Sequence, residues 1–146
     1  ITARLSPKPL DLNVNELYLL QGTVPALPRS DDGASVQLQV LGSHAGSSEG
    51  SGIYLTDSAF KADQYTEEHP SSGLCAMLFC RACLGRIINH SEGDRDGNSM
   101  RRGSEYHSVK MSSQEVNEYV LFDPSQVYVE YVVWYRRRYQ KLCEET

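Results

Sequence analysis

The apolar positions of this chain fall into short runs that are separated by turn-forming residues. Runs rich in β-branched and aromatic residues and bounded by Gly, Pro, Asn or Asp are typical of β-strands. One helix is also predicted, with Asp57 as its N-cap and its end near Thr66. We expect strands at residues 16–20, 53–55, 74–84, 118–122 and 127–139, the last two joined by a turn at 123–125.

The segments between these runs carry the marks of irregular structure. Residues 1–12 contain two of the prolines and are expected to form an irregular N-terminal arm. Pro25 and Pro28 disfavour a long helix after the first strand. Residues 41–52 are rich in Gly and Ser, which predicts a flexible loop of the kind that often carries binding function. The polar stretch 86–117 predicts a long exposed loop.

Length and composition indicate a single globular domain. The 146 residues are 40% hydrophobic and 23% charged, which is enough apolar material to bury one core. Many short strands with one helix favour an α+β fold, mainly antiparallel β, over residues 1–146. Because the chain begins at Ile1 rather than at Met, we expect it to be a piece of a longer protein.

The charge balance excludes two classes of partner. A formal net charge of −5 disfavours general binding to nucleic acid or to an anionic membrane, since both require a basic surface. No apolar run approaches the roughly 20 residues of a transmembrane helix. We therefore expect no nucleic-acid binding and no membrane insertion by this domain.

The four cysteines leave two interpretations. Cys75, Cys80 and Cys83 share one apolar segment, and the odd spacing of Cys80 and Cys83 would turn their side chains to opposite faces of a strand. Reduced, buried thiols fit that arrangement. A zinc site would need a turn there and further ligands such as His69, His90 or Cys143. We expect no metal.

Glu130 stands out in the apolar run from Val127 to Tyr135. This run predicts a strand buried on both faces, with Tyr128, Glu130, Val132 and Trp134 on one of them. A carboxylate among apolar side chains is costly unless something binds it, so Glu130 is a candidate for a functional site. The alternative is an edge-strand carboxylate that reaches water or pairs with an arginine of the 136–138 run.

Several segments together resemble the catalytic domain of the poly(ADP-ribose) polymerase (PARP) family of ADP-ribosyltransferases. They occur in the family's order and cover about residues 13–136. The matching segments are residues 13–23 with Gln21-Gly22-Thr23, residues 41–46, Gly50-Ser-Gly-Ile-Tyr-Leu55, Lys61-Ala-Asp-Gln-Tyr65, residues 77–85, residues 106–109, and residues 118–131 beginning Glu118-Tyr-Val.

The resemblance implies a fold, a co-substrate and an activity. The implied ADP-ribosyltransferase fold is a split β-sandwich of two roughly perpendicular antiparallel sheets with few helices, and NAD+ lies in the cleft between them. The implied activity is transfer of ADP-ribose from NAD+ to protein acceptors with release of nicotinamide, and mono-transfer is favoured over polymer formation. Such a domain is expected to be intracellular, nuclear or cytoplasmic, and monomeric in isolation.

The resemblance also implies the site residues. The family's catalytic His, Tyr and Glu are carried over to Gln21, Tyr54 and Glu130, so that a glutamine replaces the histidine. Glu130 would hold the nicotinamide ribose and orient the acceptor, and Tyr54 and Tyr65 would stack on nicotinamide. Gly22 would present its backbone to the carboxamide. The implied NAD+-binding positions are Gln21, Gly22, Thr23, Ser43, Tyr54, Lys61, Ala62 and Tyr65.

Two of these positions leave a second function open. Gln21 can donate and accept hydrogen bonds but differs in shape from histidine, and Ala62 stands where the family usually has a serine hydroxyl. Together with Pro25 and Pro28, these departures favour a catalytically degenerate domain that binds NAD+ or ADP-ribose or acts as a protein-interaction module. The retained acid favours an active transferase.

Overall fold

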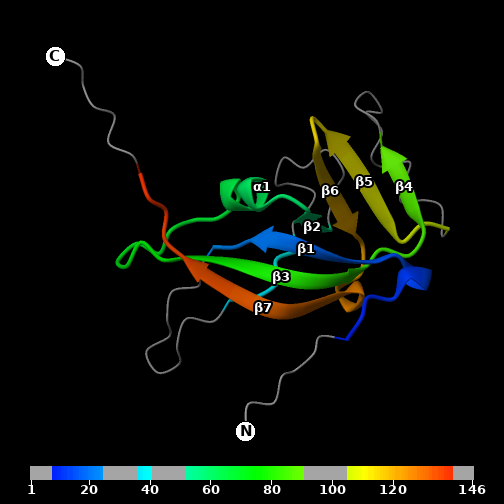
Figure 1. Ribbon diagram of the computed structural model, residues 1–146, viewed down its shortest axis with the longest axis horizontal. Coiled ribbons are helices and arrows are strands. Elements are labelled where there is room, and N and C mark those ends of the chain that lie inside the picture. Colours follow the sequence, from blue (N-terminus) through cyan, green and yellow to red (C-terminus); the bar gives the residue numbers. More distant parts are fainter. Residues whose placement is uncertain (1–7, 25–35, 41–51, 91–104, 140–146) are drawn as a thin grey trace, which may run out of the picture.

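The computed structural model describes residues 8–24, 36–40, 52–90 and 105–139. Within them the chain forms seven strands, one α-helix and two short 3-10 helices (Figure 1). The elements are η1 (Leu12–Val14), β1 (Glu16–Gly22), β2 (Ile53–Thr56), α1 (Ala59–Gln64), β3 (Cys75–Cys83), β4 (Ile87–His90), β5 (Ser108–Ser113), β6 (Val116–Leu121), η2 (Pro124–Gln126) and β7 (Val127–Tyr135). The predicted mainly-β α+β architecture with few helices is confirmed.

The strands form one sheet in the order β4-β5-β6-β2-β1-β3-β7. Neighbouring strands are antiparallel except β4 and β5, which are parallel. The sheet has two limbs that meet between β1 and β2, where only Leu20 and Thr56 pair. Figure 1 shows β4, β5 and β6 running at a steep angle to β1, β3 and β7. The structure thus differs from two separate antiparallel sheets, because one residue pair keeps the limbs continuous.

The core lies on the inner faces of these two limbs. Its largest side chains come from β1, β2, β3 and β6 and include Leu19, Leu55, Leu78 and Leu121, all at most 2% exposed. Burying a leucine completely contributes about 1.5–3 kcal/mol to folding. Among the described residues, Val36 and Leu38 from outside the strands also pack against this core.

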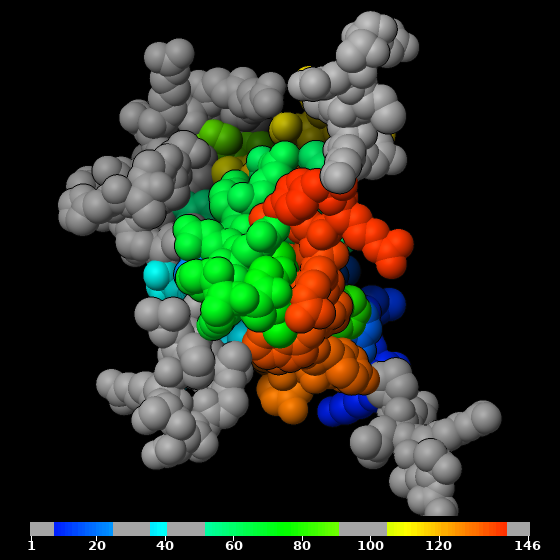
Figure 2. Space-filling view, turned by 90° about the vertical axis from the view of Figure 1, so that its left-hand side faces the viewer, coloured from blue at the N-terminus to red at the C-terminus, as the bar shows by residue number. Residues whose placement is uncertain are grey.

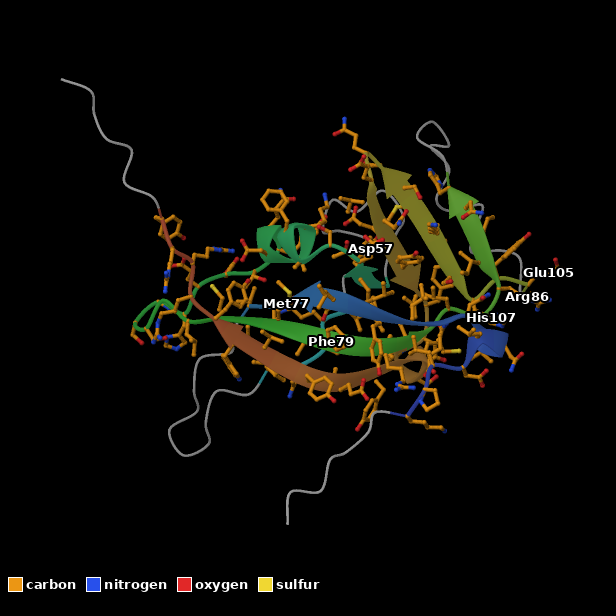
Figure 3. The ribbon with its side chains drawn as sticks, viewed as in Figure 1. Asp57, Met77, Phe79, Arg86, Glu105 and His107 are labelled. Carbon is orange, nitrogen blue, oxygen red and sulfur yellow. The ribbon has the colours of Figure 1, made fainter. Side chains whose placement is uncertain are left out.

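The turn after β3 depends on a glycine. Gly85 has a φ of 57°, and a Cβ there would lie 2.5 Å from Nδ1 of His107. His107 accepts a hydrogen bond from the backbone N–H of Arg86 (2.9 Å) and donates its own N–H to the Arg86 carbonyl (2.9 Å). Arg86 and His107 therefore lie side by side at this corner (Figure 3) and place β5 beside β4.

Two predictions about strands are wrong. The strand from Val127 is not buried on both faces. Within the described residues β7 is an edge strand that pairs only with β3; it ends at Tyr135 and leaves Tyr128 67% and Val133 46% exposed. An apolar composition does not distinguish an edge strand from a central one. The stretch 86–117 is also not one loop, because it contains β4 and β5.

The helix begins one residue later than predicted. Ser58, not Asp57, is the N-cap, and its side chain accepts a hydrogen bond from the backbone N–H of Lys61. The Asp57 carboxylate instead accepts from the backbone N–H (3.0 Å) and the side-chain amide (2.7 Å) of Asn117 at β6. No helix in the described part of the chain is long and apolar enough to cross a membrane. The segments around Pro25, Pro28 and residues 41–51 lie outside the described residues.

Candidate functional site

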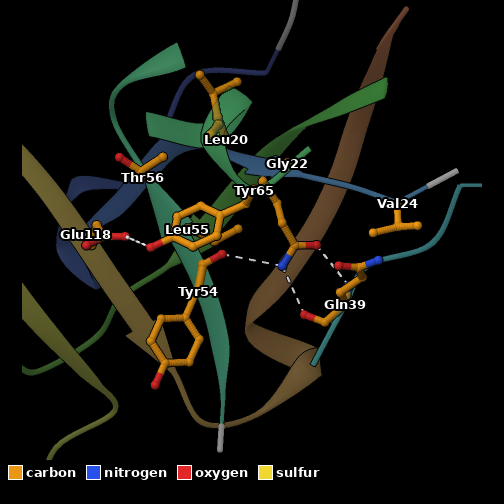
Figure 4. Close-up of a pocket in the computed structure, with 11 residues that line it drawn as sticks. Leu20, Gly22, Val24, Gln39, Tyr54, Leu55, Thr56, Tyr65 and Glu118 are labelled. Atoms are coloured by element: carbon orange, nitrogen blue, oxygen red, sulfur yellow. Dashed lines mark hydrogen bonds between the residues drawn. The ribbon is translucent and has the colours of Figure 1, made fainter. Parts of the chain in front are cut away.

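A pocket opens at the joint between the two limbs of the sheet. β1 pairs with β2 only through Leu20 and Thr56. Gln21 and Gly22, at the end of β1, are therefore not paired with β2. The opening has a volume of about 200 Å³. It is lined by Leu20, Gln21, Gly22, Val24, Gln39, Tyr54, Leu55, Thr56, Ala62, Tyr65 and Glu118 (Figure 4).

Five residues selected from the sequence line this pocket together. Gln21 and Gly22 come from the end of β1, Tyr54 from β2, Ala62 from α1, and Tyr65 from its C-cap. The chain brings them from positions up to 44 residues apart to one opening, which their spacing in the sequence does not show.

Two other predicted binding residues, Thr23 and Lys61, are not part of the lining. Thr23 is fully buried and donates its hydroxyl hydrogen to the Ala76 carbonyl (2.8 Å), which ties β1 to β3. Lys61 lies at the rim, with its ammonium 5.6 Å from the centre of the Tyr65 ring. Ser43 lies outside the described residues.

The carboxylate of this pocket belongs to Glu118. Strand β6 pairs with β2 so that Glu118 is opposite Thr56, and its side chain reaches the pocket beside Tyr65. The Tyr65 hydroxyl donates to Oε1 of Glu118 (3.1 Å), as Figure 4 shows, and the Lys61 ammonium lies 3.9 Å from Oε2. A carboxylate held by a hydroxyl and an ammonium keeps further lone pairs with which to accept a hydrogen bond from a ligand hydroxyl.

Tyr65 is held in its protonated form. Burial, followed by the charge of Glu118 and its hydrogen bond, raises the pKa of Tyr65 to about 12. At neutral pH the phenol therefore stays a hydrogen-bond donor to Glu118. Its ring forms part of the pocket wall, where a flat ligand could stack.

Gln21 is fixed by the backbone of a neighbouring segment. Its Nε2 donates to the Gln39 carbonyl (2.9 Å) and to the Tyr54 carbonyl (3.4 Å), while its Oε1 accepts from the Gln39 N–H (2.8 Å). The reciprocal pair with Gln39 fixes the orientation of the side-chain amide. Both N–H groups of Gln21 are used in these bonds, so none remains for a ligand in this arrangement.

Gly22 allows β1 and α1 to touch. A Cβ at this position would lie 2.0 Å from the Ala62 carbonyl oxygen and 2.6 Å from Oγ1 of Thr66. Ala62 is fully buried at this contact. The close approach requires glycine and brings the helix over the end of β1, where it forms one wall of the pocket.

Glu130 does not line the pocket. The register of β7 against β3 places Val129 opposite Cys80 and Tyr131 opposite Phe79, which leaves Glu130 as the extra residue of a β-bulge. The rings of Phe79 and Tyr131 are 6.0 Å apart, so Tyr131 shares the Phe79 face. The bulge thus breaks the predicted alternation along β7.

Glu130 instead belongs to a cluster around Arg81. Its Oε1 lies 3.6 Å from the Arg81 guanidinium, which also contacts Glu16 (3.2 Å) and the Tyr18 hydroxyl (2.9 Å). Leu78 of β3 is the sheet partner of Gln21, so these two side chains lie on the same face of the sheet. Arg81 is three residues further along β3, so its side chain lies on the opposite face. The expected grouping of Glu130 with Gln21 and Tyr54 is therefore not found, and Glu130 pairs with Arg81 rather than with residues 136–138.

Glu118 was not singled out from the sequence. It stands at the head of the apolar run 118–122, where a carboxylate ordinarily reaches solvent. Only the register between β2 and β6 reveals that it lies over the pocket.

The described residues contain no group of three or more His, Cys, Asp or Glu side chains that could hold a metal ion. Cys75, Cys80 and Cys83 are free thiols, of which the first two are buried. A zinc site therefore finds no ligand set within the described part of the chain. Comparison of the sequence with models of known protein families and with curated proteins found no match.

Proposed function

We propose that this pocket binds NAD+ and that the chain is an ADP-ribosyltransferase of PARP type in which Glu118 has the role that the sequence suggested for Glu130. The observation that supports the proposal most strongly is the convergence of Glu118, Tyr54, Tyr65 and Gly22 on one opening. These residues come from β6, β2, the end of α1 and β1. An acid beside two aromatic rings and an accessible strand end is the combination that the chemistry needs.

Each group has a separate task in the proposed reaction. The bond between nicotinamide and C1′ of the ribose breaks, a protein nucleophile forms a new bond to C1′, and nicotinamide leaves with the bonding electron pair. The transition state has oxocarbenium character, as in glycoside hydrolysis. Glu118 accepts a hydrogen bond from a ribose hydroxyl and orients the acceptor, while Tyr54 and Tyr65 stack on the departing ring.

A second candidate is NAD+ or ADP-ribose binding without transfer. It is favoured by the Gln21 side chain, whose amide N–H groups are both bonded to backbone carbonyls. A donor that is already used in this way must break a bond before it can hold a ribose hydroxyl, at a cost on the order of 1 kcal/mol. Ala62 also offers no hydroxyl to a carboxamide.

The test compares two identical substitutions. Purified protein is incubated with labelled NAD+, and incorporation of label and release of nicotinamide are measured for the native chain, Glu118→Gln and Glu130→Gln. We expect Glu118→Gln to lower transfer by about 10²–10³-fold, as loss of a group that stabilises the transition state does. Glu130→Gln should retain transfer, with thermal unfolding measured to confirm that it is folded.

Other outcomes separate the two candidates. Loss of transfer in Glu130→Gln alone, with a folded protein, contradicts the assignment of Glu118. An inactive native chain that binds NAD+ in calorimetry, with transfer appearing in Gln21→His, supports the second candidate. Absence of both binding and transfer rejects both. Mass spectrometry of modified protein measures the length of the product, which we expect to be one unit.

A further inference from the structure

Arg137 lies just after β7 and reaches the helix that forms one wall of the pocket. Its Nε donates to both carboxylate oxygens of Asp63 (3.0 and 3.1 Å), and its Nη1 lies 3.6 Å from Glu68. Its Nη2 donates to the backbone carbonyls of Asp63 (2.7 Å) and Thr66 (2.8 Å). Figure 2 shows the segment after α1, in green, packed against the red residues that follow β7.

These contacts add to the backbone bonds at the C-terminal end of α1, where the Asp63 carbonyl also accepts from the Thr66 N–H. The last carbonyls of a helix have no partner within it, and a cation at that end is favourable. The hydrogen bond to Asp63, followed by other contacts, raises the pKa of Arg137 further above its ordinary value. Tyr135, the last residue of β7, also donates its hydroxyl hydrogen to Asp63. The end of β7 is thus connected to the end of the helix by several bonds.

Tyr65 lies between the two residues whose carbonyls Arg137 binds. Asp63 precedes Tyr65 by two positions and Thr66 follows it directly. A single guanidinium therefore restrains the backbone on both sides of Tyr65, whose hydroxyl bonds to Glu118 in the pocket.

We propose that Arg137 is a positioning residue for the pocket, which acts by holding Tyr65 against Glu118. The expected effects of Arg137 on ligand binding and transfer rest on the proposed function. Its structural part, the restraint of Tyr65, does not depend on any ligand. The Arg137 partners described above, Asp63, Thr66 and Glu68, are not among the lining residues, so its effect on the pocket passes through the backbone around Tyr65.

The first experiment measures the restraint directly. Amide hydrogen exchange is followed by NMR in the native chain, Arg137→Ala, Arg137→Lys and, as a matched control, Arg138→Ala, which removes an exposed arginine next to it. The reporting amides are those of Tyr65 and Thr66, which donate to Ala62 and Asp63, and Val109 in β5 serves as the reference. In Arg137→Ala we expect exchange at Tyr65 and Thr66 to accelerate by about tenfold or more through local opening, with Val109 unchanged.

Arg137→Lys keeps the charge but not the fork of donors, so it should show a smaller acceleration in the same amides. Arg138→Ala should leave all of them unchanged. Unchanged exchange at Tyr65 in Arg137→Ala would overturn the proposal. Equal acceleration at Tyr65 and Val109 in both Arg137 variants would also overturn it, because it would show a general role in stability.

The second experiment tests whether Arg137 acts through Tyr65. The dissociation constant of nicotinamide is measured for Arg137→Ala, for Tyr65→Ala, which removes both the ring and the hydroxyl, and for the double variant. We expect Arg137→Ala to weaken binding by about tenfold, in line with the cost of misplacing a contact group. In the Tyr65→Ala background the same change should have little further effect, because the group that Arg137 positions is already absent.

Full additivity of the two changes would overturn the coupling through Tyr65. A native chain that binds no nicotinamide would reject this part of the proposed function, while the exchange measurement would still decide the role of Arg137. The two failures are therefore distinguishable.

Discussion

Glu118 and Glu130 show how strongly position decides the chemistry of a residue type. Both lie on strands, and both contact a cation. Glu118 accepts from a tyrosine hydroxyl beside an open pocket, whereas Glu130 faces a guanidinium on the other face of β3, and its Oε2 is buried without a hydrogen bond from any described group. The first environment leaves a carboxylate able to bind a ligand. The second uses it to neutralise Arg81.

At the same scale, Gly22 has a steric role that can be tested. In Gly22→Ala the new Cβ would meet the Ala62 carbonyl at 2.0 Å, so the helix must move. We expect a loss of stability of about 1–3 kcal/mol, the usual cost of overpacking, and a weaker contact between Tyr65 and Glu118. Urea unfolding and nicotinamide binding measure the two effects.

Gly73→Ala is the matched control for that substitution. Gly73 has a φ of 65°, but nothing lies within 4 Å of the position where its Cβ would be. It should lose stability through backbone strain alone, with binding unchanged. If Gly22→Ala keeps both the native urea midpoint and native binding, the close contact of β1 with α1 is not needed for the pocket.

At the scale of elements, α1 depends on its surroundings. A helix of six residues is too short to be stable alone in water. It is held at its start by the Ser58 cap and at its end by Arg137, and Gly22 permits its close contact with β1. Its position, and with it one wall of the pocket, is therefore determined by tertiary contacts.

The Ser58 cap gives a prediction for this element. In Ser58→Ala the N–H of Lys61 loses its acceptor, and the free energy of unfolding should fall by about 1 kcal/mol. Chemical denaturation measures the change, with Ser113→Ala at an exposed position of β5 as the control. A Ser58→Ala protein as stable as the native chain would show that α1 does not need its cap.

The elements that were predicted correctly share one property. Apolar runs marked β1, β2, β3 and β6 to within a few residues, because a strand that contributes to the core must carry apolar side chains. β4 and β5 were missed because they lie in a polar stretch. Ser108 in β5 is buried although it is polar, and its hydroxyl donates to the Leu84 carbonyl. The exposure of β7 was missed because it depends on the strand order.

The site was predictable in part for the same reason. The resemblance selected Gln21, Tyr54, Ala62 and Tyr65, which the structure brings to one pocket. The resemblance also placed the catalytic glutamate at Glu130, and the cost of a carboxylate among apolar side chains favoured the same residue. The β-bulge in β7 and the register between β2 and β6 determine that Glu118, and not Glu130, lies at the pocket. The amino-acid composition of an apolar run predicts neither the bulge nor the register.

At the scale of the whole molecule, the single pair Leu20 and Thr56 is the joint of the sheet. On one side lie β1, β3 and β7, and on the other β2, β6, β5 and β4. The pocket occupies this joint and takes residues from both limbs. Ligand contacts on both limbs would therefore add to the few interactions that hold them together at this point.

Three side chains with raised pKa values predict the response of the whole fold to alkali. Burial raises the pKa of Cys80 to about 12, and burial together with Glu118 does the same for Tyr65. Burial and the hydrogen bond to Asp63 raise the pKa of Tyr135 to about 12. In the unfolded chain these groups titrate near 8.5 for cysteine and about 10 for tyrosine.

The direction of the effect follows from proton binding. Below the unfolded pKa values each group is protonated in both states, so its contribution to stability is fully present. Between those values and about 12 the unfolded chain has released protons that the folded chain retains, so the free energy of unfolding falls as the pH rises.

We expect the urea midpoint to decrease steadily from about pH 9 upward. Tyr135→Phe should make this decrease shallower, whereas Tyr128→Phe, at a side chain that is 67% exposed, should keep the native slope. A midpoint that stays constant to pH 11 would show that the fold does not hold these phenols and this thiol in their neutral forms. An equal slope in all three proteins would show the same for Tyr135 alone.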